Sequence, residues 1–218
     1  PTSSNLNRVI LEIADTIHPQ LSAAQINLST GVVVVVFSEP VDSWPATNVQ
    51  LNLITLGNAE AADPTTDILL SESTVKSYGT DPSALEAAVV TEDHHSTITI
   101  TLTERMRASA IEISNTTGGD GTAAQVIRSL SGAFRDIGEN PSVENVGLVM
   151  TEIADDIAPQ ITRVRLNLGT GQLRVQCSEI LDLKCTDDNA KCKLNRLFLS
   201  DTPGDKSIPL VGSRVASQ

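Results

Sequence analysis

The sequence predicts an all-β protein made of antiparallel β-sandwich units in tandem, with one short helix per unit. A stretch of about 32 residues occurs twice, at positions 11–42 and 151–182, without a gap and with about half of its positions identical. Between the two copies lie many short apolar segments separated by turns rich in Gly, Pro and Asn. Many short strands with such turns are typical of a sandwich.

The repeat also sets the expected domain boundaries. Residues 5–14 match residues 145–154, so residues 1–14 are expected to be the last strand of a preceding unit. Residues 15–154 are then one complete unit, and residues 155–218 begin a second, incomplete one. We expect the chain to be part of a longer array. Donation of the spare first strand to another chain would explain the same boundaries.

The first two strands are expected at residues 21–28 and 32–38, on either side of a turn in which Gly31 supplies a positive φ. Five consecutive valines begin the second strand, and β-branched side chains favour a strand over a helix. The matching segment 172–177 alternates polar and apolar residues. This alternation predicts an inward face of Val33, Val35 and Phe37 and an outward face of Val32, Val34 and Val36.

Further strands are expected in the same unit at residues 49–56, 68–75, 97–102, 123–130 and 145–154. Residues 57–67 are expected to form a loop and residues 92–95 a polar turn, while residues 83–90 fit either a helix or a strand. The one helix is expected at residues 103–111, with Thr103 as its N-cap. Its predicted inner face consists of Met106, Ala110 and Ile111.

Composition excludes several classes of function. The net charge of −12 and the pI of about 4.5 argue against nucleic-acid binding, which needs a basic surface, and fit cation binding or a solvated acidic surface. Aromatic residues make up 2% of the chain, too few for the stacking faces typical of lectins. No stretch approaches the roughly 20 apolar residues of a membrane span. None of the common catalytic motifs is present, so we expect no enzymatic activity.

Four short motifs resemble the pattern of bacterial and algal Ig-like tandem repeats. They are Asp15-Thr16-Ile17-His18-Pro19, Leu28-Ser29-Thr30-Gly31, Phe37-Ser38-Glu39-Pro40-Val41 and Asp136-Ile137-Gly138-Glu139-Asn140. Such repeats occur in large cell-surface, adhesion and cell-wall proteins, so the resemblance implies Ig-like sandwiches and an extracellular role. The second copy departs from the pattern, because Cys177 replaces Phe37 and Ile180 replaces Pro40.

Six carboxylates at strand ends and in the linkers are candidate calcium ligands. Glu39 and Asp136 are expected to converge with the linker residues Asp155 and Asp156, and Asp15 with Glu179 are the counterparts of this set in the repeat. Calcium prefers six to eight oxygen ligands, which carboxylates at a domain junction can supply. The alternative is that the aspartates are turn residues that bond their own backbone.

Two covalent modifications are also expected. Cys185 and Cys192 flank a short acidic loop, and in an extracellular protein a disulfide would close it; the alternative is free thiols. Cys177 occupies an inward strand position and is expected to be a buried free thiol. Asn27 and Asn115 begin N-glycosylation sequons in a eukaryotic source, and the alternative is two unmodified side chains.

Together these features favour an extracellular structural segment of a tandem Ig-like array, such as a filament or sheath component. Its partners would be other units of the same array or copies of the same chain. The alternative is an adhesion or binding module for a polysaccharide or a surface protein, which would bind through the loops at 57–67, 76–95 or 114–122.

Overall fold

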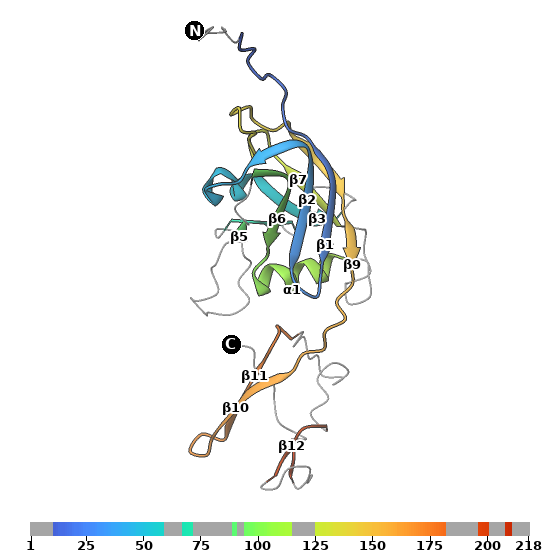
Figure 1. The fold of residues 1–218 in the computed structure, drawn as a ribbon. Coiled ribbons are helices and arrows are strands. Elements are labelled where there is room, and N and C mark those ends of the chain that lie inside the picture. Colours follow the sequence, from blue (N-terminus) through green and yellow to red (C-terminus); the bar gives the residue numbers. More distant parts are fainter. Residues whose placement is uncertain are drawn as a thin grey trace, which may run out of the picture. The chain divides into compact units, whose positions relative to one another are not determined.

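The computed structural model describes residues 11–58, 67–71, 89–90, 94–114, 125–181, 196–200 and 208–210. The predictions for Asn115, Cys185 and Cys192 lie outside these residues. Most of the predicted loops 57–67, 76–95 and 114–122, and most of the segment 83–90, also lie outside them. The chain separates into two compact units, and the boundary falls between Asp155 and Asp156 (Figure 1). We call them unit 1 and unit 2.

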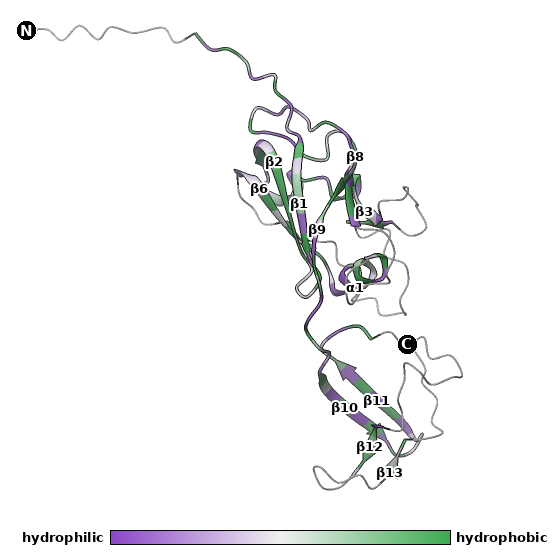
Figure 2. Cartoon of the chain, turned by 90° about the vertical axis from the view of Figure 1, so that its right-hand side faces the viewer, coloured by the Kyte–Doolittle hydropathy of each residue, from purple (hydrophilic) through white to green (hydrophobic). Residues whose placement is uncertain are grey.

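Unit 1 is a sandwich of two sheets, which confirms the predicted all-β class (Figure 2). The five-stranded sheet has the order β5 (Val89–Val90), β6 (His94–Thr101), β2 (Val32–Asp42), β1 (Leu21–Asn27) and β9 (Thr151–Ile153). The four-stranded sheet has the order β4 (Ile68–Leu69), β3 (Ile54–Asn58), β7 (Gln125–Ser129) and β8 (Asn145–Val149). All neighbouring strands are antiparallel except β1 and β9, which are parallel.

The core lies between the two sheets. The predicted inward face of β2 is confirmed, because Val33, Val35 and Phe37 are buried. The Phe37 ring packs edge-on against Phe134, with ring centroids 4.7 Å apart. The outward valines of β2 are half-buried, because β2 lies in the middle of its sheet between β1 and the threonine-rich β6.

The predicted helix is present as α1 (Glu104–Ile113), and the Thr103 hydroxyl accepts a hydrogen bond from the Met106 N–H at 3.2 Å. Met106 and Ala110 are buried as expected, but the third apolar contact is Ile113, whereas Ile111 is half-buried. The reason is the helical period of 3.6 residues, which puts position 113 rather than 111 on the inner face.

Several boundaries differ from the prediction. The strand expected at 32–38 continues to Asp42, and the strand expected at 68–75 ends at Leu69. The expected strand 49–56 begins only at position 54, because two 3₁₀ turns, η1 (Ala46–Asn48) and η2 (Leu51–Leu53), precede it. The expected turn at 92–95 is partly strand, since β6 begins at position 94 and pairs with the end of β2. The expected strand 145–154 is two strands in different sheets, joined at the buried Met150, whose N–H donates to the Gln125 carbonyl.

Unit 2 contains two described two-stranded sheets, β10 (Ile161–Asn167) with β11 (Gln172–Cys177), and β12 (Phe198–Leu199) with β13 (Ile208–Pro209). The β10–β11 hairpin reproduces β1–β2 in register at a spacing of 140 residues, including the irregularity near its start. The turn glycines, Gly31 and Gly171, have φ of 70° and 68°.

The hydrogen bonds of the two hairpins also match. The Ser38 N–H donates to the Gln20 carbonyl at 2.9 Å, and the Ser178 N–H donates to the Gln160 carbonyl at 2.8 Å. In both turns an asparagine side-chain oxygen accepts bonds from the backbone two and three residues later. Among the described residues, no helix is both long and apolar enough to span a membrane.

Candidate metal centre

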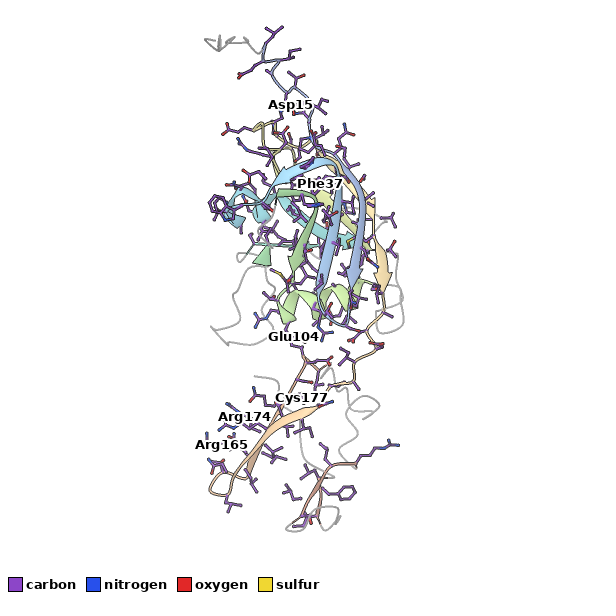
Figure 3. The ribbon with its side chains drawn as sticks, viewed as in Figure 1. Asp15, Phe37, Glu104, Arg165, Arg174 and Cys177 are labelled. Atoms are coloured by element: carbon purple, nitrogen blue, oxygen red, sulfur yellow. The ribbon has the colours of Figure 1, made fainter. Side chains whose placement is uncertain are left out.

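Three carboxylates from separate segments meet at the end of unit 1 where β1 begins. Asp15 precedes β1, Glu39 lies in β2, and Asp136 lies in the loop between β7 and β8 (Figure 3 labels Asp15). One oxygen of each residue lies within 4.8 Å of the other two. Asp15 is exposed, Glu39 half-buried, and Asp136 only 3% exposed. We call these three residues the acidic cluster.

The loop that carries Asp136 is fixed to the end of β2. The Asp42 N–H donates to the Arg135 carbonyl at 2.7 Å, and Asp136 forms an isolated antiparallel bridge with Val41. Asn140 donates its backbone N–H to Asp136 Oδ1 at 2.7 Å and its Nδ2 to Oδ2 at 2.8 Å. Because each carboxylate oxygen can accept two bonds, both Asp136 oxygens keep acceptor capacity for a cation.

The linker segment before β1 is held against the same loop. Asp15 Oδ1 accepts a hydrogen bond from the Ile17 N–H at 3.0 Å, and the Asp15 carbonyl accepts one from Asn140 Nδ2 at 3.3 Å. His18 Nδ1 lies 2.8 Å from the Pro141 carbonyl. The predicted turn bonds of Asp15 and Asp136 are therefore present, and they orient the carboxylates that form the cluster. His18 was not predicted to lie near the carboxylates. Its position three residues after Asp15 is the sequence feature that indicates it.

The surroundings of Glu39 change the pKa of its carboxyl group. Burial raises the pKa of its carboxyl above the usual range, and the neighbouring Asp136 and Asp15 charges raise it further, while His18 lowers it. Its Oε1 is buried and accepts no hydrogen bond from the described residues. Within the described part of the chain, no Lys or Arg forms an ion pair with any of the three carboxylates. A bound cation or a water molecule would satisfy this buried acceptor.

Gly138 allows the loop to close this tightly. A Cβ atom at this position would lie 3.3 Å from Asn140 Nδ2 and from Asp136 Oδ1, and 3.5 Å from Asp15 Cβ. A larger residue would therefore press on the side chains of Asn140 and Asp136, whereas its contact with Asp15 would be an ordinary one.

The donor set of the cluster fits a hard divalent cation. Three carboxylates supply between three and six oxygens, and calcium takes six to eight, so water or backbone carbonyls would complete the shell. Zinc would prefer nitrogen or sulfur ligands in a tetrahedral arrangement. The residues present therefore fit calcium.

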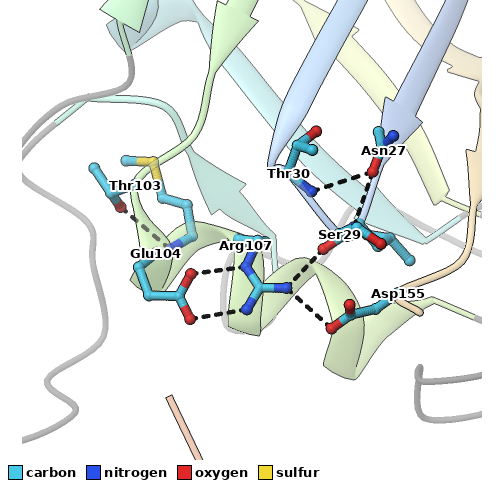
Figure 4. Close-up of polar contacts among 9 residues, drawn as sticks. Asn27, Ser29, Thr30, Thr103, Glu104, Arg107 and Asp155 are labelled. Carbon is cyan, nitrogen blue, oxygen red and sulfur yellow. Dashed lines mark hydrogen bonds and ion pairs between the residues drawn. The ribbon is translucent and has the colours of Figure 1, made fainter. Parts of the chain in front are cut away.

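The structure groups Glu39 and Asp136 with Asp15 and separates them from Asp155, which corrects the predicted set. Asp155 lies beside α1, at the opposite end of unit 1 from Asp15 (Figures 3 and 4). Each linker lies at one end of the long hairpin, and β2 returns to the end where β1 starts. The strand-end carboxylates therefore meet the linker that precedes the unit. Asp156 and Glu179 lie in unit 2, and the one group of possible metal ligands found among the described residues does not include them.

Asp155 has a different role, as a partner of the buried Arg107 (Figure 4). Arg107 Nη1 donates to Asp155 Oδ2 at 3.0 Å and to the Leu28 carbonyl at 2.7 Å. Its Nε and Nη2 donate to the two carboxylate oxygens of Glu104 at 2.7 and 2.9 Å. The guanidinium thus joins the helix, the β1–β2 turn and the start of the following linker.

Two further candidates, Asn27 and Cys177, lie among the described residues. Asn27 is half-buried, and its side-chain oxygen accepts bonds from the N–H groups of Ser29 and Thr30 at 2.9 and 3.1 Å. Its glycosylation stays a prediction. Cys177 is a free thiol as expected, although it is half-buried rather than fully buried.

Comparisons with known proteins do not assign the chain to a family. No protein-family model matches the chain, and no curated protein matches it. A solved structure, described as surface layer protein SbsC, domains 1–6, is 14% identical with a TM-score of 0.35. The alignment covers 74% of this chain and 18% of that one. This likeness is too low to show a shared fold. The chain is thus defined as an all-β sandwich protein with an internal repeat.

Proposed function

We propose that this chain is a structural segment of a tandem array of Ig-like β-sandwich units at a cell surface, such as a filament or sheath component. The observation that carries the proposal is the repeat. The same hairpin, with the same register and turn hydrogen bonds, occurs in both units 140 residues apart. Its partners would be other units of the array or copies of the chain.

The way the chain leaves unit 1 supports a mechanical role. The first strand β1 and the last strand β9 are parallel and adjacent, with Gln25, Ile26 and Asn27 opposite residues 151–153. Tension applied to the two ends would therefore pull these strands in opposite directions along their length. It would load their hydrogen bonds together, in shear, rather than one after another.

The last residue of β9 and the two residues after it are also held in place. The Ile153 carbonyl accepts a bond from the Leu28 N–H at 2.9 Å, and the Ala154 carbonyl accepts one from the Ser29 hydroxyl at 3.3 Å. Asp155 then pairs with Arg107. Three successive residues at the exit of the unit are thus anchored, as a unit that transmits force to a neighbour would require.

Calcium binding at the acidic cluster is the second part of the proposal, favoured by the buried Glu39 Oε1 that lacks a hydrogen-bond partner among the described residues. An ion there would join the linker to two elements of unit 1. It would remove the repulsion among three carboxylates and stiffen the entry to the unit.

Two experiments test these proposals separately. The intact mass of the native polypeptide is measured together with negative-stain images of the same material. A mass well above 23.1 kDa in a beaded rod, or long filaments of 23.1 kDa subunits, is the expected result, and a small free monomer would overturn the structural role. Calorimetric titration with Ca²⁺ should give a saturable signal in the native chain and none in Asp136→Asn. Absence of heat at millimolar Ca²⁺ would remove the metal site but leave the array intact.

A further inference from the structure

Charge is distributed very unevenly along the chain. Residues 156–218 contain nine of the 15 Lys and Arg residues and seven of the 27 Asp and Glu residues, a local charge of +2. Residues 1–155 contain the other six basic and 20 acidic residues, a local charge of −14. Residues 156–218 are therefore weakly basic when taken by themselves, whereas the rest of the chain is strongly acidic.

Three arginines of unit 2 lie on one face of the β10–β11 hairpin. Arg163 and Arg165 alternate along β10 with the apolar Val164 and Leu166, so they share the opposite face from these two residues. Arg174 of β11 is the direct cross-strand partner of Arg165, and Figure 3 shows the two side by side. We call these three residues the arginine face.

The arginine face is open to solvent and carries a concentrated positive charge. All three side chains belong to exposed residues. Among the described residues, no carboxylate lies within ion-pair distance of Arg163 or Arg165. Arg163 and Arg165 lie two residues apart on the same side of β10, so one extended anion can contact both guanidinium groups.

We propose that the arginine face binds a linear acidic polysaccharide through its carboxylate or sulfate groups. Guanidinium groups bind such anions through two parallel hydrogen bonds, which makes arginine the side chain best suited to this contact. The exposed amides of Gln172 and Gln176 lie on the same face and can bond sugar hydroxyl groups. Binding of this kind needs no aromatic stacking plane, so the scarcity of aromatic residues does not oppose it.

The dimensions of the face favour a polymer chain over a protein partner. Two strands of six and seven residues present roughly 24 by 10 Å, about 240 Å², at the standard strand rise and spacing. A stable protein interface buries about 800 Å² per partner and has an apolar centre. Within the described hairpin the arginine face is smaller than this and consists of polar side chains, and a linear chain of charged sugars fits along it.

Unit 1 provides an internal comparison. The positions equivalent to the three arginines are Ala23, Gln25 and Val34, on a hairpin of the same register. The two hairpins therefore share a backbone but differ in outward charge. Binding to the anionic polymer is expected in unit 2 alone, and it is independent of the calcium site proposed in unit 1.

The test measures binding of the full chain to oligogalacturonate, which carries carboxylates, to dextran sulfate, and to neutral dextran. We expect saturable binding to one or both acidic polymers and none to neutral dextran. Three charge contacts to a linear polyanion predict that the affinity falls about 20-fold between 50 and 200 mM salt. The variant R163Q/R165Q/R174Q should lose at least about tenfold in affinity at low salt.

Two further variants make the result decisive. K184Q/K193Q/K206Q removes the same charge from the same unit at lysines outside the described residues, and it should bind nearly as well as the native chain. Replacing the three arginines by lysine keeps the charge and should give intermediate affinity, which excludes misfolding as the cause of the loss. The proposal is overturned if neither acidic polymer binds at low salt, or if both glutamine variants lose affinity equally. It is also overturned if the arginines prove to mediate only self-association, seen as a salt-sensitive dimer in sedimentation of the native chain.

Discussion

Replacing Glu39 by Gln should stabilise unit 1 in the absence of calcium. The substitution removes one of three carboxylates whose oxygens lie within 4.8 Å of each other, and it keeps the side-chain shape. At that distance two unit charges repel by about 0.9 kcal/mol in water and about 3.5 kcal/mol at an effective dielectric constant of 20. Asp15 is exposed and Asp136 is buried, so their two contributions lie toward opposite ends of this range. Because the two repulsions add, we expect a gain of up to about 4 kcal/mol in EDTA at low salt.

Calcium should reverse this order. Binding to the folded state stabilises the wild type by about 2.7 kcal/mol when the free ion is at 100 times its dissociation constant. Glu39→Gln loses a charged ligand and gains less. The assay is urea unfolding followed by the fluorescence of Trp44, the single tryptophan of the chain, which lies in unit 1 and therefore reports on that unit alone.

Glu144→Gln is the matched control, because Glu144 is exposed, lies outside the acidic cluster and changes the net charge equally. It should leave the response to calcium unchanged. If Glu39→Gln proved less stable than the wild type in EDTA, Glu39 would be making a favourable contact and the reasoning would be wrong. If calcium left the wild type unchanged, the cluster would not be a metal site.

The remaining predictions concern the same unit. The pKa of Glu39 lies above its ordinary value of 4.5, so the folded state keeps a proton that the unfolded state releases. The free energy of unfolding should therefore fall as pH rises through the window just above about 4.5. Urea titrations at several pH values should show this fall in the wild type and not in Glu39→Gln. Arg107→Met leaves Glu104 and Asp155 without their buried partner and should cost about 3–5 kcal/mol in urea unfolding, whereas Arg135→Gln at an exposed site should change little. Phe134→Ala removes a fully buried ring from the core and should cost about 3–5 kcal/mol by the same measurement. Gly138→Ala should weaken calcium binding in calorimetry while the unit stays folded; unchanged affinity would show that the loop can yield without disturbing the cluster.

The hairpin and its core were predictable because two independent patterns agree there. The valine run excludes a helix, and the alternating segment 172–177 fixes which valines face inward. The expected strand at 49–53 failed because local bonds compete with sheet pairing. The Asn48 N–H donates to the Pro45 carbonyl, and the Asn48 side chain donates to Asp42, which closes 3₁₀ turns before β3 begins.

The sequence predicted the kind of ligand at the candidate site, but it predicted only in part which carboxylates meet there. Strand-end carboxylates indicate a cation, and Glu39 and Asp136 do meet. Sequence spacing does not reveal which linker folds back on them, because Asp15 and Asp155 are equivalent in the repeat. The difference depends on tertiary contacts: Asn140 holds Asp15 at one end of unit 1, and Arg107 holds Asp155 at the other. Nothing in the helix sequence distinguishes Arg107 from an exposed, solvated arginine.

The comparison of the two hairpins indicates where units of this kind acquire different functions. The positions of the buried face of β2 keep their apolar character in the second hairpin, as at Val35 and Val175, although of these two residues only Val35 is buried in the structure. At the outward positions Val34 becomes Arg174 with no change in the register of the hairpin. A repeat can therefore conserve the backbone of its hairpin while each unit presents a different surface. The outward residues of each sheet, rather than the motifs that identify the repeat, are consequently the positions at which specific ligands should be sought.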